Sequence, residues 1–346
     1  YTLYIWLRYV EDPTINLASL LGTSVKAYVS VNGSDTKEST SCTFDSSKKI
    51  SYVVTFMNTD NKTVLETRKV SSGSALGNLP STRQYFTKTG GNGTEYTSTS
   101  TITDDALVYP KLTKFELDSW TTIATNVRNG NTGDYNVGDT KEVNLGTTYG
   151  THTLRIANTT TPSECSTSGF SQTACGFVLE FADIITTYEM NDTDTNVGGW
   201  PASSMYDFVN YDIYNSLPSD LKSTIIDTTV VSSHGSTNGE NFTSIDKLYL
   251  LSLKEVYSDW STNSYSSYDS AKDLTRTLDY YINKNVTSSD DSETIKKYKT
   301  TDSWWWLREA HSNYDHSFFI VPTDDYSYFS TYANTSGGVS PAFRIG

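Results

Sequence analysis

The chain has 346 residues, and its 26 Lys and Arg against 40 Asp and Glu give a formal net charge of −14. Phosphate backbones and anionic lipid headgroups repel such a protein, which argues against nucleic-acid binding and electrostatic membrane docking. No apolar run approaches the length of a membrane span. The 25 Tyr, 13 Phe and 7 Trp supply bulky core residues, while the abundant Ser, Thr, Asn and Asp predict β-rich surfaces and long loops of an exported protein.

The first segment, residues 1–45, contains two β-like runs, at 1–10 and 25–31. Leu3, Ile5 and Leu7 alternate with other residues in the first run, but no sequence upstream could pair with it. We therefore expect this strand to belong to a partial β domain or to pair with another subunit. The chain does not begin with Met and shows no signal peptide, so we expect a leader or an anchor before Tyr1.

The second segment, residues 46–113, begins with a strand-like run at 52–56, and a second strand follows a polar turn. A glycine-rich turn at 90–93 precedes a closing segment at 102–109. This order of elements resembles the internalin-type B-repeat, a small β-grasp module that serves as a spacer in bacterial surface proteins. The chain departs from that family at 85–88, where Tyr-Phe-Thr-Lys stands in place of the usual Gly-Trp pair.

The third segment, residues 114–346, is predicted to be one mixed domain. Apolar residues recur at helical spacing in three stretches, at 120–127, 205–213 and 274–282. The first stretch follows a candidate cap at Asp118 or Ser119 and stops at Gly130. Apolar and aromatic runs predict strands at 153–157, 177–182, 248–251, 304–307, 318–321 and 339–345.

Three cysteines are present, Cys42, Cys165 and Cys175. The turn-rich stretch between the last two is compatible with a hairpin-closing disulfide, and two isolated thiols are the alternative. The spacing of the cysteines matches no zinc site.

Seven short phrases follow one another along the third segment: Val137-Gly138-Asp139, Met190-Asn191, Gly198-Gly199-Trp200, Leu217-Pro218-Ser219-Asp220-Leu221, Asp246-Lys247-Leu248-Tyr249-Leu250-Leu251-Ser252, Trp305-Trp306-Leu307-Arg308 and Gly338-Val339-Ser340-Pro341-Ala342-Phe343. Together, and in this order, they are similar to a bacterial surface family built on the C-type lectin fold in its formylglycine-generating-enzyme-like form. We expect the Trp-Leu-Arg and Pro-Ala-Phe strands to pair as the core of a compact sheet, and Trp306 and Arg308 to support the site without contacting ligand.

Residues 309–336 contain four Tyr, five Ser, three Asp and two His but no Lys, a mixture typical of antibody paratopes. Tyrosine supplies rigid contact area, and short polar side chains supply adaptable hydrogen bonds. We expect Phe318, Ile320 and Phe329 to be core residues, and we expect the residues that alternate with core residues along a strand to be exposed. The candidate ligand-binding residues are His311, Asn313, Tyr314, Asp315, His316, Asp324, Asp325, Tyr326, Tyr328, Ser330, Tyr332 and Asn334.

The same fold occurs in variable products of diversity-generating retroelements, in which adenine mutation changes asparagine codons. Codons derived from AAC exclude Lys, Gln, Glu, Met and Trp, and residues 309–336 fit this set except at Glu309, which would be a fixed position. Many members of the family are not diversified, so both alternatives stay open.

No catalytic or metal site is predicted. The formylglycine-generating relatives need cysteines in the C-terminal half, and none follows Cys175. The calcium-binding tripeptides of sugar-binding lectins are missing, and the acidic string at 192–196 has Val197 and Ser203 where an EF-hand needs Gly and Glu. His311 and His316 are read as exposed contact residues, since the four histidines are too scattered for a zinc protease.

The sequence therefore predicts an α+β protein with a C-terminal C-type-lectin-like domain at 114–346, a β-grasp module at 46–113 and an N-terminal β segment at 1–45. Its expected function is non-enzymatic ligand binding at the extracellular cell surface, with no cofactor and no metal. The expected partner is a protein or glycan on another cell or on a phage or host surface, with no nucleic acid and no direct membrane insertion. The alternative is a structural subunit of a pilus-like filament that self-associates through residues 1–10.

Overall fold

The computed structural model describes residues 51–290, 292–323 and 329–346, with both helices and strands in an α+β arrangement. The expected strands at 1–10 and 25–31, and Cys42, lie outside the described residues. The chain divides into two compact units after Leu112. In the described parts, no helix has the length and apolar character needed to cross a membrane.

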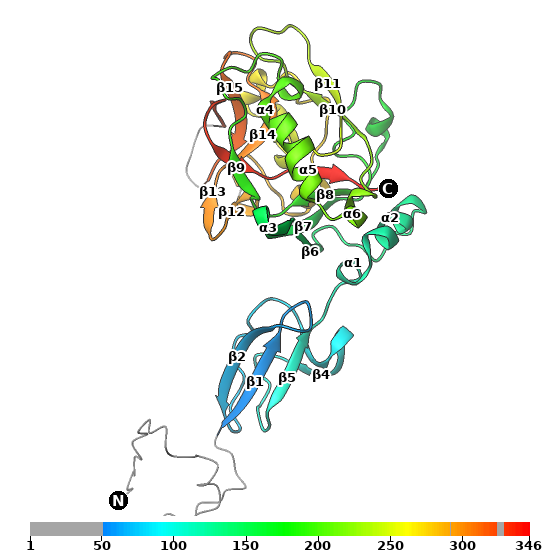
Figure 1. Cartoon of the computed structure of the whole chain (residues 1–346), viewed down its shortest axis with the longest axis vertical. Helices are drawn as coiled ribbons and strands as arrows, with labels where there is room; N and C mark the ends of the chain where they lie inside the picture. Colours follow the sequence, from blue (N-terminus) through cyan, green and yellow to red (C-terminus); the bar gives the residue numbers. More distant parts are fainter. Residues whose placement is uncertain (1–50, 291, 324–328) are drawn as a thin grey trace, which may run out of the picture. The chain divides into compact units, whose positions relative to one another are not determined.

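The first unit is a five-stranded sheet in the order β2-β1-β5-β3-β4 (Figure 1). Strand β1 pairs antiparallel with β2 and parallel with β5 at the centre of the sheet. One face of the sheet carries the core, in which the rings of Phe56 and Tyr85 meet edge to face at 5.1 Å. The strands are β1 Ser51–Met57, β2 Val64–Ser71, β3 Tyr85–Lys88, β4 Asn92–Tyr96 and β5 Ala106–Pro110, with the 3-10 turn Thr89–Gly91 between β3 and β4.

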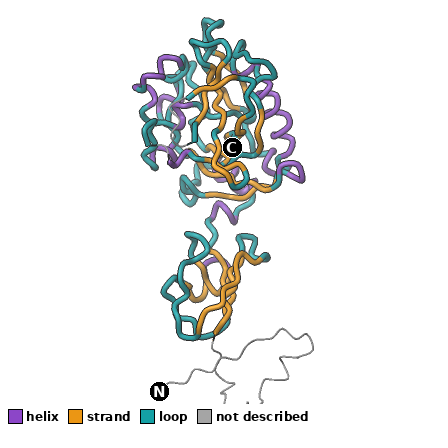
Figure 2. The backbone as a smooth tube through the Cα atoms, turned by 90° about the vertical axis from the view of Figure 1, so that its left-hand side faces the viewer, coloured by secondary structure: helices purple, strands orange, loops and turns teal. Residues whose placement is uncertain are grey.

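The second unit contains two main sheets, ordered β16-β15-β14-β17-β9 and β18-β8-β7-β6, and two hairpins. Figure 2 shows its strands at the centre and helical segments on the outer sides. The strands of the main sheets are β6 Thr140–Asn144, β7 Thr151–Asn158, β8 Val178–Phe181, β9 Thr186–Tyr188, β14 Trp305–Ala310, β15 Ser317–Val321, β16 Ser330–Tyr332, β17 Gly337–Val339 and β18 Ala342–Arg344. The hairpins are β10 Thr228–Ser232 with β11 Phe242–Asp246, and β12 Lys296–Tyr298 with β13 Thr301–Ser303.

The helices of the second unit are short, and four of them, α1, α2, α4 and α7, begin at a Thr or Ser cap. The Ser119 hydroxyl accepts a hydrogen bond from the Thr122 amide and so caps α2, which confirms the predicted helix and one of its two candidate caps. The stretch at 205–213 is also helical, since α4, a π-helical turn and α5 form one continuous run. The α-helices are α1 Lys114–Leu117, α2 Trp120–Arg128, α3 Gly146–Tyr149, α4 Ser204–Asp207, α5 Tyr214–Ser216, α6 Ser219–Lys222, α7 Leu253–Val256 and α8 Asp279–Asn283, with the π turn at Phe208–Ile213 and 3-10 turns at Ser163–Ser166, Trp200–Ala202, Trp260–Thr262, Ser264–Tyr268 and Ser292–Thr294.

The third expected helix, at 274–282, is wrong over its first half, because α8 begins only at Asp279. Before it, Thr275 and Thr277 donate their hydroxyl hydrogen bonds to Glu255 and to the Lys254 carbonyl, so this stretch is fixed by side-chain contacts as an irregular segment. The expected strand at 248–251 is also wrong. It is a buried irregular segment that forms one bridge, between Tyr249 and Ala342, and a short apolar run cannot distinguish these cases.

The predicted C-terminal strand at 339–345 is interrupted, and its two halves belong to different sheets. Strand β17 joins β14 and β9, whereas β18 joins β8. Pro341 lies at the interruption, where it has no amide hydrogen to contribute to a ladder. The expected pairing of Trp-Leu-Arg with Pro-Ala-Phe is therefore wrong, since Trp305 pairs with Gly338 and Phe343 pairs with Leu179.

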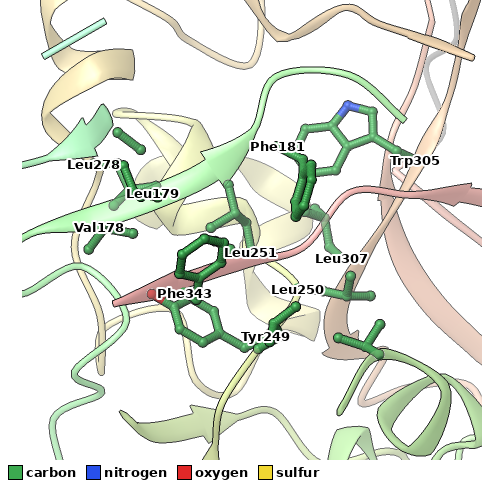
Figure 3. Packing of buried hydrophobic residues seen from close by; sticks show 14 of the residues in the cluster. Val178, Leu179, Phe181, Tyr249, Leu250, Leu251, Leu278, Trp305, Leu307 and Phe343 are labelled. Atoms are coloured by element: carbon green, nitrogen blue, oxygen red, sulfur yellow. The ribbon is translucent and has the colours of Figure 1, made fainter. Parts of the chain in front are cut away.

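The core of the second unit lies between the two main sheets and the segment at 248–251 (Figure 3). Phe181 and Phe343 meet at 6.4 Å, and Trp305 and Leu307 reach the same region from β14. A disulfide joins Cys165 to Cys175, which confirms the hairpin-closing alternative over two isolated thiols. Fully buried apolar residues on both sheets make this core a rigid base for the loops that leave it.

Candidate functional site

Strand β14 lies wholly inside the second unit and leads directly into the loop that carries several predicted site residues. All six of its residues, Trp305–Ala310, are buried. His311 follows, and its amide donates to the Ser317 carbonyl, so that residues 311–317 form the turn between β14 and β15. The position of this turn therefore depends on how β14 is fixed.

Arg308 is the central anchor of β14. Its guanidinium makes two parallel hydrogen bonds of 2.7 Å to Glu255, and it also donates to the carbonyls of Val231 and Leu250. Thr173 and Thr275 donate their hydroxyl hydrogen bonds to the same Glu255 carboxylate. Both charges are fully buried, and removing one partner of such a pair leaves the other uncompensated. Arg308 and Trp306, which we expect to be supporting residues, are both fully buried.

Two further carboxyl groups, Glu309 and Asp269, are buried beside this pair and complete a buried ion cluster of Arg308, Glu255, Glu309 and Asp269. Burial raises the pKa of Glu309 to about 8; the Arg308 charge opposes this rise and the Asp269 charge adds to it. Burial likewise raises the pKa of Asp269 to about 6. Because one cation faces three acids, the cluster holds a proton near neutral pH.

Asn196 fixes the loop at 311–317 from outside β14. Its side-chain amide donates to the carbonyls of His311, Tyr314 and Ser317, and its backbone amide donates to the carbonyl of Asp315. Asn196 is fully buried and ends the acidic string at 192–196. A single side chain therefore holds three carbonyls of the loop in place.

Asn191 connects the same string to the chain beyond β16. Its backbone amide donates to the Ala333 carbonyl, and its side-chain amide donates to the Thr195 carbonyl at 2.6 Å. The Ala333 amide donates in turn to the His316 carbonyl. Residues 191–196, 311–317 and 333 are thus joined by backbone hydrogen bonds into one layer.

Five aromatic side chains stack in sequence across this layer and form a ring ladder, defined here as Tyr268, His311, Tyr314, His316 and Tyr332. Successive ring centroids are 4.7, 4.6, 5.5 and 5.0 Å apart, and the interplanar angles lie between 22° and 28°. Phe319 also stacks on His311, at 5.2 Å. Offset stacking at such spacings is favourable for aromatic pairs, so the ladder is a preorganised arrangement of rings.

The most buried ring of the ladder is His311, while Tyr268 and His316 are half-buried and Tyr314 and Tyr332 are exposed. His311 is 3% exposed, whereas Tyr314 is 47% and Tyr332 is 56% exposed. Burial, with the nearby His316 charge, lowers the pKa of His311 to about 4, so His311 is neutral at physiological pH. Its Nδ1 accepts a hydrogen bond from the Asn313 amide, and Nδ1 of His316 lies 2.8 Å from Oδ1 of Asp315.

The described candidate residues fall into a buried member and an exposed group. The expectation that His311 is an exposed contact residue is wrong, because its ring is covered by Tyr268, Tyr314 and Phe319. His316 and Ser330 are half-buried, and the exposed residues are Asn313, Tyr314, Asp315, Tyr332 and Asn334. Asp324, Asp325, Tyr326 and Tyr328 lie outside the described residues.

In strand β15, the side chains that alternate with the core residues are not exposed as expected. Phe318 and Ile320 are buried as predicted, and Phe329 packs against the core, but Phe319 is also buried, as are all the residues of Ser317–Val321. Its second face is covered by His311 and Trp260, which both pack on Phe319. Among the described residues, the display surface therefore comes from the loop at 311–316 and from β16 with the residues that follow it, 330–334.

Sequence reasoning missed three residues of this site, Tyr268, Asn191 and Asn196. Tyr268 lies far from the loop in sequence, but its carbonyl accepts a hydrogen bond from the Ser312 amide. The acidic string at 192–196 lacks the Gly and Glu of an EF-hand and is typical of a solvated acidic loop, whereas its last residue is a buried support of the ladder. Among the described residues, no three His, Cys, Asp or Glu side chains are grouped so that they could hold a metal ion.

Residues 177–346 match the family model described as "Domain of unknown function (DUF6273)". The match begins just before β8 and includes Asn191, Asn196 and the whole ring ladder. No curated protein and no solved structure matches the chain.

Proposed function

We propose that the second unit is a non-enzymatic ligand-binding unit that displays the ring ladder to a protein or glycan ligand. The observation that carries this proposal is the ladder itself: stacked rings, fixed by Asn196 and the buried end of β14, reach the surface at Tyr314 and Tyr332. Binding energy is commonly concentrated in a few rigid aromatic residues. A ligand that meets preformed rings loses little free energy to ordering them.

The fold proposal keeps the C-type-lectin-like assignment for the second unit and the β-grasp assignment for the first. In the first unit, β1 and β5 pair in parallel, and this pair lies between β2 and β3 in the sheet. This arrangement supports the β-grasp assignment. In the second unit, long loops above a sheet of short strands support a ligand-display fold. We place the protein at the extracellular cell surface, where the first unit serves as a spacer and the partner is on another cell or on a phage or host surface.

Diversification of residues 309–336 belongs to the same proposal. Glu309, the one residue in this stretch outside the accessible codon set, is buried beside Arg308 and would be held constant. Tyr314, Asp315, Tyr332 and Asn334 are exposed and can change without altering the core. Sequences of several copies of the gene would show substitutions concentrated at these exposed positions if the stretch is diversified.

The ligand-binding proposal is tested by selection with the full chain. A phage-displayed library of random 12-residue peptides and a glycan array would be screened with the wild type, with Tyr314→Ala/Tyr332→Ala and with Tyr211→Ala. Tyr211 is 72% exposed and lies outside the ladder, which makes it a matched control. We expect the wild type and the control to select the same ligands, and the double variant to lose them while its melting temperature stays within a few degrees.

Two results would overturn the proposal. One is that neither screen yields a ligand of the wild type; the other is that ligands bind the double variant as well as they bind the wild type.

A further inference from the structure

We propose that the outer face of Tyr332 binds the guanidinium group of an arginine side chain on a protein partner, so that this planar cation continues the ring ladder. This inference rests on the proposed ligand-binding function and names the chemistry of its partner. It follows from the geometry at the end of the ladder and from the charge of the loops around it.

Tyr332 is the exposed end of the ladder. One face of its ring stacks on His316 at 5.0 Å, and within the described residues no other ring contacts Tyr332. The side chain is nevertheless 56% exposed, and β16 holds its backbone opposite Ser317 of β15. A planar group of matching size can therefore stack on Tyr332 as Tyr332 itself stacks on His316.

The inner rings are less suited to this role, because their faces are already covered. His316 has Tyr314 on one side and Tyr332 on the other, and Tyr314 lies between His311 and His316. The face of an aromatic ring carries the negative part of its quadrupole and the edge carries the positive part. A cation is thus attracted to the outer face of Tyr332, which no ring of the described residues covers, and not to the ring edges along the ladder.

The surrounding loops favour a cation. Residues 184–216 and 309–343 contain no Lys and no Arg. Asp192, Asp194 and Asp315 are exposed, and hydrogen bonds place their segments beside the ladder: Asn196 binds the Asp315 carbonyl and Asn191 binds the Ala333 carbonyl. The carboxylate of Asp315 also lies 2.8 Å from the ring of His316, the neighbour of Tyr332. Carboxylates beside an exposed tyrosine ring are complementary to a cation.

Arginine fits this end better than lysine or a sugar. A guanidinium is planar, is weakly hydrated, and can stack on a ring while its N–H groups point outward to carboxylates. A lysine ammonium is a compact, strongly hydrated charge and cannot continue a stack of planes. A neutral sugar can stack on the ring and donate hydroxyl hydrogen bonds to the carboxylates, but it gains no attraction between opposite charges, and an anionic sugar is repelled.

Binding of three synthetic peptides to the full chain would test the inference. The probes are fluorescein-labelled Gly-Arg-Gly-Arg-Gly-Arg-Gly and the same peptide with lysine or with citrulline, the uncharged analogue of arginine, at each arginine position. We expect the arginine peptide to bind at least tenfold more tightly than the citrulline peptide and about threefold more tightly than the lysine peptide. Equal binding of the arginine and citrulline peptides would overturn the proposal.

Variants separate stacking from general attraction between opposite charges. Tyr332→Leu keeps an apolar side chain but removes the ring face. This variant should bind the arginine peptide at least tenfold more weakly than the wild type does. Tyr332→Phe should bind nearly as the wild type does, Asp315→Asn about threefold more weakly, and Tyr211→Ala without change. If Tyr332→Leu binds the peptide like the wild type, the acidic surface alone attracts the peptide, and the proposal that the guanidinium stacks on Tyr332 is wrong.

The outcome also distinguishes this inference from the broader function. If the library and the glycan array select ligands that lack arginine and depend on Tyr314 and Tyr332, the ladder is a binding surface but the arginine assignment is wrong. If neither screen selects a ligand and the arginine peptide does not bind, both proposals fail.

Discussion

The buried ion cluster around Arg308 and the ring ladder from Tyr268 to Tyr332 meet at the end of β14, but they are held in different ways. Arg308 is fully buried and is fixed by a paired carboxylate and by the carbonyls of Val231 and Leu250. The rings are fixed by one another and by the hydrogen bonds of Asn196 to the backbone of their loop.

This difference separates stability from binding. Inside the unit, each polar group depends on a specific partner, so that substitution leaves a buried charge or an unpaired donor. At the surface, the loop backbone holds the rings, so the side chains of Tyr314 and Tyr332 can change while the fold persists. The same arrangement is expected of any protein that varies its contact surface over a constant base.

The largest effect is expected when the positive charge of Arg308 is removed from the buried ion cluster. Arg308→Met should lower the free energy of unfolding by about 3–5 kcal/mol, because Glu255 would remain buried without its partner. Urea unfolding followed by tryptophan fluorescence would measure the change. Arg128→Met, at an exposed position, is the control and should change stability by less than about 1 kcal/mol. A small effect of Arg308→Met would mean that the ion cluster does not anchor β14.

The second test addresses the link between the two regions. Asn196→Ala removes three side-chain hydrogen bonds to loop carbonyls and should lower the free energy of unfolding by about 2–3 kcal/mol. It should also abolish any binding that depends on Tyr314, because the loop at 311–317 loses its fixed position. Asn334→Ala, at an exposed position of the same layer, should leave stability unchanged. Ligand binding by a folded Asn196→Ala variant at wild-type strength would contradict the link.

The third test uses pH. Because burial raises the pKa of Glu309 to about 8, the folded state holds a proton that the unfolded state loses near pH 4.5. This contribution to stability is complete below about pH 4.5 and decreases as pH rises toward 8. The wild type should therefore lose on the order of 1–3 kcal/mol of unfolding free energy between pH 5 and pH 9. Glu309→Gln should make the free energy of unfolding depend less on pH, and thermal unfolding between pH 5 and pH 9 would measure this. If the variant keeps the pH dependence of the wild type, other groups cause it.

The smallest effect is expected at the surface end of the ladder. Tyr332→Ala removes one stacking contact of an exposed side chain, so the free energy of unfolding should fall by about 1 kcal/mol or less. Differential scanning calorimetry would measure it beside Tyr211→Ala. If Tyr332→Ala lowered the free energy of unfolding as much as Arg308→Met does, the exposed rings would contribute to stability like the buried residues, and the two regions would not differ.

The sequence predicted those features that depend on local patterns. Helix α2 follows from apolar spacing and a serine cap, and β15 follows from a run of aromatic and β-branched residues. It could not predict the burial of both faces of β15, because the covering residues, His311 and Trp260, lie on other segments. Side-chain alternation describes a strand with one free face and fails for one that is covered on both.

The candidate site was predictable in composition but not in geometry. Tyr314, His316 and Tyr332 were found because tyrosine, histidine and short polar residues gather near one strand. The order of the rings could not be derived, since Tyr268 joins the stack from a distant segment. The supporting role of Asn196 had no local signal either, because its partners are backbone carbonyls that any sequence offers.

The division of residues 337–344 between two sheets has a consequence for how the chain matures. Strand β17 lies between β14 and β9, and β18 completes the edge of the other sheet beside β8, so both sheets acquire these neighbours from the same short stretch. A ribosome makes that stretch after β6 to β16, which leaves their apolar faces incompletely covered until it emerges. Native closure of the two sheets is therefore a late event of long sequence separation, and nascent chains of this protein are expected to depend on chaperones that shield unpaired strands until then.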